Sequence, residues 1–341
     1  MGFSRRNFLR LSGLSAFALL GGASTAINKI NNPSLSLIKP KRISHTSTLG
    51  LIAPASPVYD KSDFEDMLIT LKNKGYTLKL GSHVRDRRGF LAGTDVDRAN
   101  DLIQMFKDPT VDAILCVRGG WGCNRILDHI DFDVIKNNPK ALIGFSDITS
   151  LHMSIQAKTG LTTFHGPVGT SDWNDFTQHS FDETLVEGKS QEYKIPGEDI
   201  SDAFTITSGK ATGRILGGNL TVLTAMIGSD YLPDFKGSIL FLEEVGEHVY
   251  RVDRMMTQLK LAGILDQISG FIFGKCTNCK QQREDFPLSQ VFEDHIKPLG
   301  IPAYYGAMIS HEEKNVTIPV GMQAEMDADR LSFKIDKAAV L

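Results

Sequence analysis

Residues 112–156 decide the fold class, and they read DAILCVRGGWGCNRILDHIDFDVIKNNPKALIGFSDITSLHMSIQ. Short apolar runs alternate here with segments whose apolar residues recur at helical spacing. The pattern predicts strands over 112–117 and 141–143 and helices over 124–130 and 148–156. Because strands that alternate with helices in this way form βαβ units, the sequence predicts an α/β fold with a mainly parallel sheet, Rossmann-like or flavodoxin-like.

The same alternation extends toward the N-terminus. An apolar run over 49–53 ends in a proline-rich turn and predicts a buried strand, and 76–80 predicts a second strand. Helices are expected over 64–71, where apolar residues recur at helical spacing, and over 95–106. Together these elements predict an N-terminal domain over residues 46–170.

The pattern changes after residue 170. Residues 171–210 are rich in Ser, Asp, Glu, Thr and Gln, which predicts a connecting segment. Glycine, β-branched and apolar clusters then predict a smaller β-rich C-terminal domain over residues 211–341. Its expected elements are a helix over 250–262 and strands over 213–219, 238–242, 270–273, 315–318 and 331–335.

Residues 1–26 resemble an export signal. Arg5 and Arg6 stand in a stretch similar to the twin-arginine motif, and a short apolar run and a small-residue tail follow. The apolar run is shorter than the roughly 20 residues that a membrane-spanning helix needs. The sequence therefore predicts a twin-arginine signal peptide over 1–26 and a polar linker over 27–45, with an N-terminal packing helix as the alternative. Such a signal implies contact with the twin-arginine translocation machinery and a periplasmic or otherwise exported protein after its removal.

The composition is that of an ordinary globular protein. Of 341 residues, 41% are hydrophobic and 23% are charged, which excludes coiled coils and bulk disorder. Lys and Arg number 37 against 40 Asp and Glu, so the net charge of −3 offers no basic surface for a nucleic acid. No nucleic-acid partner is expected.

Four cysteines allow three interpretations. Cys276 and Cys279 form a C-x-x-C pair, but Cys116 and Cys123 are too widely spaced for a typical zinc site. The alternatives to zinc are ordinary thiols and, in an oxidising compartment, a disulfide between Cys276 and Cys279. No metal or other cofactor is expected.

A candidate nucleophile lies in the segment Gly144 to Asp147. Ser146 stands between an apolar strand and a helix, which is the context of a nucleophile elbow, although the second glycine of G-x-S-x-G is missing. In an elbow, the backbone N–H of the next residue points toward a developing oxyanion. The alternative is a serine that caps the N-terminus of the helix.

Residues 118–122 form a glycine-rich turn at the end of the preceding strand. The sequence Arg-Gly-Gly-Trp-Gly lets the backbone approach a ligand closely, but it matches no phosphate-binding motif. A tight turn without a ligand is the alternative. Because both turns follow strands of one parallel sheet, they are expected to meet in one crevice.

A serine nucleophile needs a base and a carboxylate that orients it. The histidine candidates are His152, His165, His248 and His311, and the first two also suit structural roles. His311 lies in a polar break before an apolar strand, and Glu243 ends an apolar strand. A carboxylate at that position is also consistent with a simple strand exit.

Several motifs in one order resemble the LD-carboxypeptidases, a family that includes the microcin C immunity peptidases. The resemblance spans about 49–333 and rests on these segments: 52–56 (IAPAS), 117–122 (VRGGWG), 139–149 (PKALIGFSDIT), 165–167 (HGP), 217–220 (GGNL), 242–244 (LEE), 250–254 (YRVDR), His311, Asn315 and 319–321 (PVG).

The resemblance implies a role for individual residues. Ser146 would be the nucleophile, His311 the general base and Glu243 the carboxylate that orients it, and the backbone N–H groups of Gly120 and Asp147 would form the oxyanion hole. It also implies a Rossmann-like N-terminal domain that carries the serine and a smaller β-rich domain that carries Glu and His. One departure is Ser310, where the family usually has glycine, and its side chain is expected to crowd the loop that aims His311.

The family's activity implies removal of the terminal D-alanine from murein tetrapeptides by hydrolysis of an L,D amide bond. Two alternatives stay open: cleavage of a peptide–nucleotide or other modified C-terminal amide, and peptide binding without cleavage on the same scaffold. Trp173 is a candidate for stacking on a substrate group, or for ordinary packing. The sequence also leaves a homodimer open.

Overall fold

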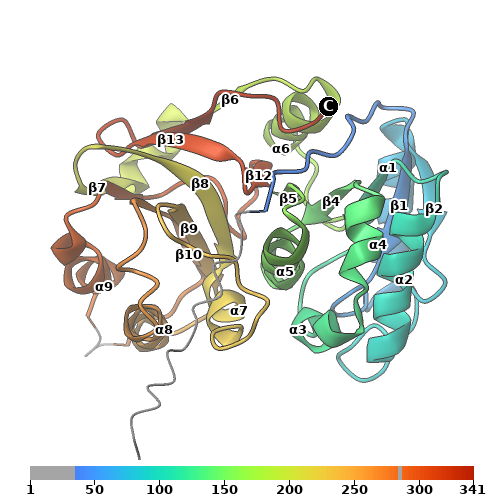
Figure 1. Ribbon diagram of the computed structural model, residues 1–341, viewed down its shortest axis with the longest axis horizontal. Helices are drawn as coiled ribbons and strands as arrows, with labels where there is room; N and C mark the ends of the chain where they lie inside the picture. The colour runs from blue at the N-terminus through green and yellow to red at the C-terminus, as the bar shows by residue number, and fades with distance from the viewer. Residues whose placement is uncertain (1–34, 283–285) are drawn as a thin grey trace, which may run out of the picture. The chain divides into compact units, whose positions relative to one another are not determined.

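Two β-sheets organise the chain in the computed structural model, which describes residues 35–282 and 286–341 (Figure 1). Both sheets belong to one unit that runs from Leu35 to Leu341. The signal peptide predicted over 1–26 and the first part of the linker predicted over 27–45 lie outside the described residues. Among the residues that are described, no helix has the length and apolar character needed to cross a membrane.

The first sheet has the strand order β12-β5-β4-β3-β1-β2, and all its neighbours are parallel except β12 and β5. Without β12, the order is that of a flavodoxin-like sheet, which decides between the two predicted kinds. The strands lie close to their predicted positions: β1 (Thr48–Ile52), β2 (Thr77–Leu80), β3 (Ala113–Cys116), β4 (Ala141–Gly144) and β5 (Thr163–His165).

Helices follow the strands of this sheet. Every residue of β3 and β4 is buried, as expected for central strands of a parallel sheet that is covered on both faces. The helix predicted over 124–130 is divided into a short α-helix and the 3₁₀ turn Leu127–His129. The helices are α1 (Lys61–Asn73), α2 (Asp95–Lys107), α3 (Cys123–Ile126), α4 (Phe132–Asn137) and α5 (Thr149–Thr159).

The second sheet is mixed, with the order β6-β14-β13-β8-β9-β10-β11-β7. Strands β8 to β11 run parallel, and antiparallel strands flank them on both sides. Helices α7 (Leu220–Ala225), α8 (Val249–Leu261) and α9 (Leu288–His295) line up along one side of this sheet (Figure 1). The strands are β6 (Gln191–Lys194), β7 (Phe204–Thr207), β8 (Lys210–Asn219), β9 (Ile239–Val245), β10 (Gly270–Thr277), β11 (Ala303–Tyr305), β13 (Gln323–Asp327) and β14 (Ser332–Ile335).

The segment predicted as a connection, 171–210, contains helix α6 (Asp175–Phe181) and the two strands at the outer edges of the second sheet, β6 and β7. These edge strands bury few side chains, so they lack the apolar run by which strands are recognised. The strand expected over 315–318 lies at β12 (Ile318–Val320) and pairs antiparallel with β5, so the chain returns to the first sheet.

The two sheets meet where β8 ends and α5 begins. The backbone N–H of Asn219 donates a hydrogen bond to the Thr149 hydroxyl at 2.9 Å. Glycines allow this approach: a Cβ on Gly218 would lie 2.3 Å from Thr149 Oγ1, and one on Gly217 would lie 1.8 Å from the backbone oxygen of Phe241. Both glycines have positive φ, +147° for Gly217 and +145° for Gly218.

This crowding generates a stability prediction. Gly217→Ala should lower the free energy of unfolding by more than about 3 kcal/mol, because a backbone oxygen cannot move aside as a flexible side chain can. Gly228→Ala is the matched control, since Gly228 also has positive φ but no atom lies within 4 Å of its Cβ position. We expect it to cost about 1 kcal/mol from backbone strain alone. Urea unfolding curves measure both, and equal losses would contradict the role of crowding.

Candidate active site

Four of the five residues that the resemblance singled out line one pocket of about 710 Å³: Gly120, Ser146, Asp147 and His311. The fifth, Glu243, lies behind His311 and is fully buried. Turns after β3 and β4 contribute the first three residues. From β1 the chain continues to β2 on one side of the sheet and then to β3 on the other side. Open α/β sheets bind ligands in the crevice that such a reversal leaves at the carboxyl ends of the strands.

Ser146 stands on a strained turn between β4 and α5. Its φ is +64°, a left-handed conformation that costs a residue with a Cβ roughly 1–2 kcal/mol. The 3₁₀ turn Ser146–Ile148 and α5 both begin without a side-chain cap hydrogen bond, so the capping alternative is not found. Strain of this kind lifts the side chain clear of the sheet, as a nucleophile elbow requires.

The glycine-rich turn packs directly against the elbow. A Cβ on Gly119 would lie 2.8 Å from Ser146 Cβ, so only glycine fits there. Ser56, in the turn after β1, accepts a hydrogen bond from the Trp121 N–H at 3.1 Å and holds the turn in place. In the described part of the chain, the Gly120 N–H has no hydrogen-bond partner, and it is therefore free to donate to a ligand.

The side chain of Asp147 connects these two turns. Its carboxylate is 5% exposed and accepts a hydrogen bond from the Cys123 N–H at 2.7 Å. Burial raises the pKa of Asp147, while the hydrogen bonds from Cys123 and the charge of Arg98 oppose that rise. The sequence did not predict this side-chain contact, because Cys123 is distant along the chain.

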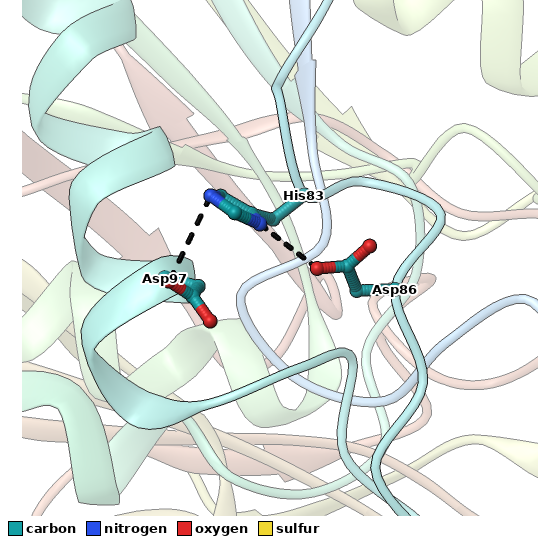
Figure 2. A group of neighbouring side chains, drawn as sticks. All are labelled: His83, Asp86 and Asp97. Atoms are coloured by element: carbon teal, nitrogen blue, oxygen red, sulfur yellow. Dashed lines mark hydrogen bonds and ion pairs between the residues drawn. The ribbon is translucent and has the colours of Figure 1, made fainter.

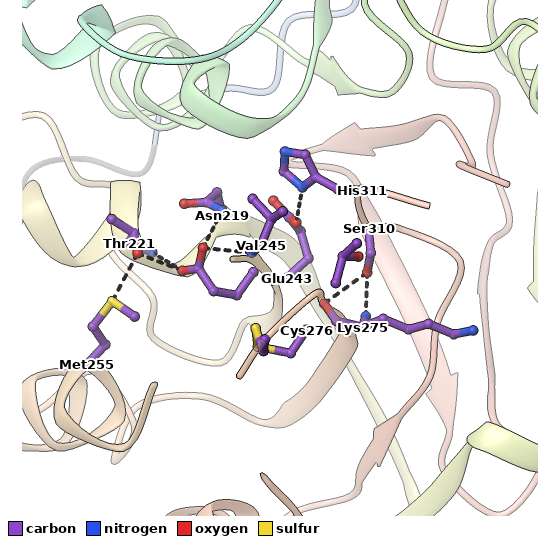
Figure 3. The surroundings of a disulfide bond; sticks show 12 residues. Asn219, Thr221, Glu243, Val245, Met255, Lys275, Cys276, Ser310 and His311 are labelled. Carbon is purple, nitrogen blue, oxygen red and sulfur yellow. Dashed lines mark hydrogen bonds and ion pairs between the residues drawn. A yellow bond between two sulfur atoms is a disulfide. The ribbon is translucent and has the colours of Figure 1, made fainter. Parts of the chain in front are cut away.

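His311 is oriented by Glu243. Its Nδ1 lies 2.8 Å from Glu243 Oε2, and Nε2 points away from the carboxylate (Figure 3). Burial lowers the pKa of His311, but the charge and hydrogen bond of Glu243, with smaller effects of Glu244 and Glu312, outweigh it and raise the pKa above its ordinary value. A neutral His311 therefore donates its Nδ1 proton to Glu243 and leaves Nε2 free to accept one.

The neighbouring carboxylate, Glu244, is held away from the histidine. It accepts hydrogen bonds from the Thr221 hydroxyl at 2.7 Å, from the Thr221 N–H, from the Asn219 amide and from its neighbour's backbone N–H (Figure 3). Glu247 pairs with Arg251 at 3.5 Å. Of these three glutamates, Glu243 is the one that contacts His311.

Ser310 does not crowd the loop as expected. Its hydroxyl accepts a hydrogen bond from the Lys275 N–H and lies 3.2 Å from the Lys275 carbonyl oxygen (Figure 3). Space for the hydroxyl exists because Gly274 has no side chain, and a Cβ there would lie 2.4 Å from Ser310 Oγ. The serine therefore ties the His311 loop to β10.

A disulfide joins Cys276 and Cys279 at the end of β10. For the C-x-x-C pair, the structure therefore has the disulfide, which was one of the three interpretations. Cys116 and Cys123 are buried free thiols. On the other side of Cys276, the Thr277 hydroxyl donates to Glu312 at 2.7 Å. Residues on both sides of Cys276 thus bind residues on both sides of His311.

His152 and His165 have structural roles. Both are fully buried, and burial lowers their pKa values to about 4 and about 3. His152 bonds the Gly144 carbonyl oxygen at 2.8 Å, and His165 bonds the Ile309 carbonyl oxygen at 3.1 Å. These contacts fix the backbone on which Ser146 and His311 stand.

Among the described residues, one group of three side chains could hold a metal ion: His83, Asp86 and Asp97 (Figure 2). The His83 ring lies 2.8 Å from Asp86 and 3.7 Å from Asp97, so these groups already pair with one another. None of them lines the pocket. The sequence shows no ligand spacing here because Asp97 comes from α2 and the other two come from the preceding loop.

Trp173, for which the sequence suggested stacking on a substrate, does not line this pocket. Its side chain is 9% exposed, its indole N–H donates to the Gly169 carbonyl oxygen, and its ring packs edge-on against Phe181. The structure therefore gives Trp173 a packing role. The exposed aromatic residues of the pocket are Phe90 and Trp121, and sequence alone does not distinguish an exposed aromatic ring from a core one.

Comparison with known proteins supports one family. Residues 49–166 match the LD-carboxypeptidase N-terminal domain, and residues 212–326 match the LD-carboxypeptidase C-terminal domain. A probable murein peptide carboxypeptidase of Bacillus subtilis is 38% identical, over 85% of this chain and 91% of that protein. The murein tetrapeptide carboxypeptidase of Pseudomonas aeruginosa is 33% identical, over 84% of this chain and 94% of that protein.

The fold is also found among solved structures. The structure of MccF in complex with glutamyl sulfamoyl guanosine matches with a TM-score of 0.83 and 27% identity, covering 89% of this chain and 99% of MccF. The two domain matches and the relatives above 30% identity point to the same family as the arrangement of Ser146, Glu243 and His311. The chain therefore belongs to the LD-carboxypeptidase family.

Proposed function

We propose that the chain is a serine carboxypeptidase that hydrolyses the amide bond between an L-centre and a terminal D-alanine in murein tetrapeptides. The observation that carries the proposal is the 2.8 Å contact between buried Glu243 and His311, in the same pocket as the strained Ser146. The names of the two murein peptidases described above support the substrate class.

The proposed reaction uses Ser146 as the nucleophile. His311 Nε2 accepts the hydroxyl proton while Ser146 Oγ attacks the scissile carbonyl carbon, and the Glu243 carboxylate stabilises the imidazolium. The N–H groups of Gly120 and Asp147 stabilise the oxyanion. The imidazolium then protonates the leaving D-alanine amine, and water hydrolyses the acyl-enzyme with His311 again as base.

A second candidate is hydrolysis of a peptide–nucleotide or another modified C-terminal amide. Similarity to MccF, together with the exposed rings of Phe90 and Trp121 in the pocket, favours it. Aromatic rings of this kind suit stacking on a planar group. Parallel assays with a D-alanine-terminated tetrapeptide and an aminoacyl sulfamoyl nucleoside separate the two candidates by their kcat/KM values.

Export through the twin-arginine pathway is part of the proposal. Arg5 and Arg6, with the apolar run and small-residue tail that follow, support it. An exported enzyme would meet its polymeric substrate outside the inner membrane. The Cys276–Cys279 disulfide agrees with an oxidising compartment.

Ser146→Ala should reduce kcat by about 10⁴-fold or more and leave the melting temperature nearly unchanged, because the lost hydroxyl makes no packing contact that the fold needs. Release of D-alanine, followed by mass spectrometry, measures the loss. Ser154→Ala is the control, since it removes a hydroxyl from α5 outside the pocket. A Ser146→Ala protein with normal turnover would refute the nucleophile, and a wild type that binds the peptide without cleaving it would indicate a binding protein.

Glu243→Gln should move the acidic limb of the kcat/KM profile to lower pH. Activity falls as His311 becomes protonated, and Glu243 raises the pKa of His311, so removal of the charge lowers the pH of that transition. The maximum rate should also fall, because the carboxylate no longer stabilises the imidazolium. Glu313→Gln, which removes a charge from the same loop, should leave the limb in place. An unchanged limb and maximum in Glu243→Gln would contradict the assignment.

Replacement of both Arg5 and Arg6 by Lys should block export, because the translocation machinery reads the arginine pair. Cell fractionation and immunoblotting compare the variant with the wild type. We expect wild type in the periplasmic fraction and the variant mainly in the cytosolic fraction. Equal export of both proteins would exclude the twin-arginine route.

A further inference from the structure

Within residues 35–282 and 286–341, one cationic side chain of the pocket, Arg118, has no acidic partner. Its four charged lining residues other than Asp147 are Arg118, Arg125, Glu244 and Glu247. Arg125 binds the Asp95 carboxylate with two donors at 2.8 and 3.0 Å, and both glutamates are bound as described above. For Arg118, no carboxylate lies within ion-pair distance in residues 35–282 and 286–341.

Arg118 is nevertheless held in place. One guanidinium nitrogen donates to the Pro57 carbonyl oxygen at 3.2 Å, and the group lies over the Tyr59 ring at 5.4 Å. These contacts orient the planar group and use one of its five N–H donors. The remaining donors form a fork that matches the two oxygens of a carboxylate.

Arg118 lines the same pocket as Ser146, where the scissile amide bond would lie. It immediately precedes Gly119, which packs on Ser146, and the next residue, Gly120, lines the same pocket. In a C-terminal amino acid, the scissile amide nitrogen and the terminal carboxylate are attached to the same carbon atom. A peptide whose scissile carbonyl lies at Ser146 therefore carries its terminal carboxylate only a few bonds away, within the same pocket.

We propose that Arg118 is a specificity-determining residue that binds the terminal α-carboxylate of the peptide and so restricts cleavage to the last residue. The inference rests on the proposed carboxypeptidase function and adds the group that makes the enzyme an exopeptidase. The backbone N–H groups near Ser146 stabilise the oxyanion, whereas Arg118 neutralises the substrate's other negative charge.

Kinetics with a matched pair of peptides test the assignment. One tetrapeptide ends in D-alanine and the other in D-alaninamide, which lacks the charge. Arg118→Met should lower kcat/KM on the D-alanine peptide by about 10- to 100-fold, mainly through a higher KM. Loss of hydrogen bonds to a charged group typically weakens binding by a factor of this size. The effect on the amide peptide should stay within a few-fold. Arg118→Lys should restore part of the loss.

Arg87→Met is the matched control. Arg87 lies over the same Tyr59 ring at 4.9 Å but does not line the pocket, so its loss should change neither substrate by more than about 2-fold. Equal losses on both peptides in Arg118→Met, or an Arg118→Met protein that behaves like Arg87→Met, would overturn the role of Arg118.

Binding to the Ser146→Ala protein separates this inference from the proposed function. Calorimetric titration should show at least 10-fold tighter binding of the D-alanine peptide than of the amide, and the difference should vanish when Arg118→Met is added. If the wild type hydrolyses neither peptide while this preference is present, the proposed activity fails and the carboxylate site stands. Equal affinities, or no binding of either peptide, overturn the carboxylate site itself.

Discussion

The pocket depends on close packing between the two sheets where β8 meets α5. There the backbone N–H of Asn219 donates a hydrogen bond to the Thr149 hydroxyl. Thr149 begins the helix that follows Ser146, and Asn219 ends the strand that pairs with the strand of Glu243. Together with the pairing of β12 with β5 and the His165–Ile309 hydrogen bond, this contact keeps the serine and the histidine in one pocket. Neither sheet holds a complete site, so close packing of β8 on α5 is a condition for any chemistry that uses both.

A second set of contacts fixes the turns that carry the backbone donors. Arg98 is almost fully buried, and its guanidinium binds the carbonyl oxygens of Pro54 and Gly122, one in each turn. Ser56 and Asp147 bind backbone N–H groups of the same glycine-rich segment. Buried polar groups are costly unless they are bonded, and here each of these side chains is bonded to backbone. The donors near Ser146 are therefore organised before any ligand arrives, which is what electrostatic stabilisation of a transition state requires.

Much of this architecture could be predicted because the signals are local. Strands of the first sheet are apolar runs, and the elbow at Ser146 is a strand, a turn and a helix in one short segment. Edge strands such as β6 and β7 could not be predicted, because half of their residues face solvent and no apolar run remains. Arg98, Asp147 and Arg118 were also missed as side chains that organise or charge the pocket. Arg98 and Asp147 bind backbone groups of segments distant in the sequence, and Arg118 lines a pocket formed by such segments. Residue spacing and hydrophobic periodicity do not predict contacts of this kind.

The return of β12 to the first sheet bears on the order in which the chain folds during synthesis. Strand β5 needs Ile318–Val320 as its antiparallel neighbour, and these residues follow the whole series β6 to β11. Until they leave the ribosome, the outer edge of β5 has no strand partner, and an unpaired edge invites association with other chains. Contacts between segments so far apart in sequence also form slowly, because a long loop must close first. The sheet of the first half of the chain is therefore completed only near the end of translation.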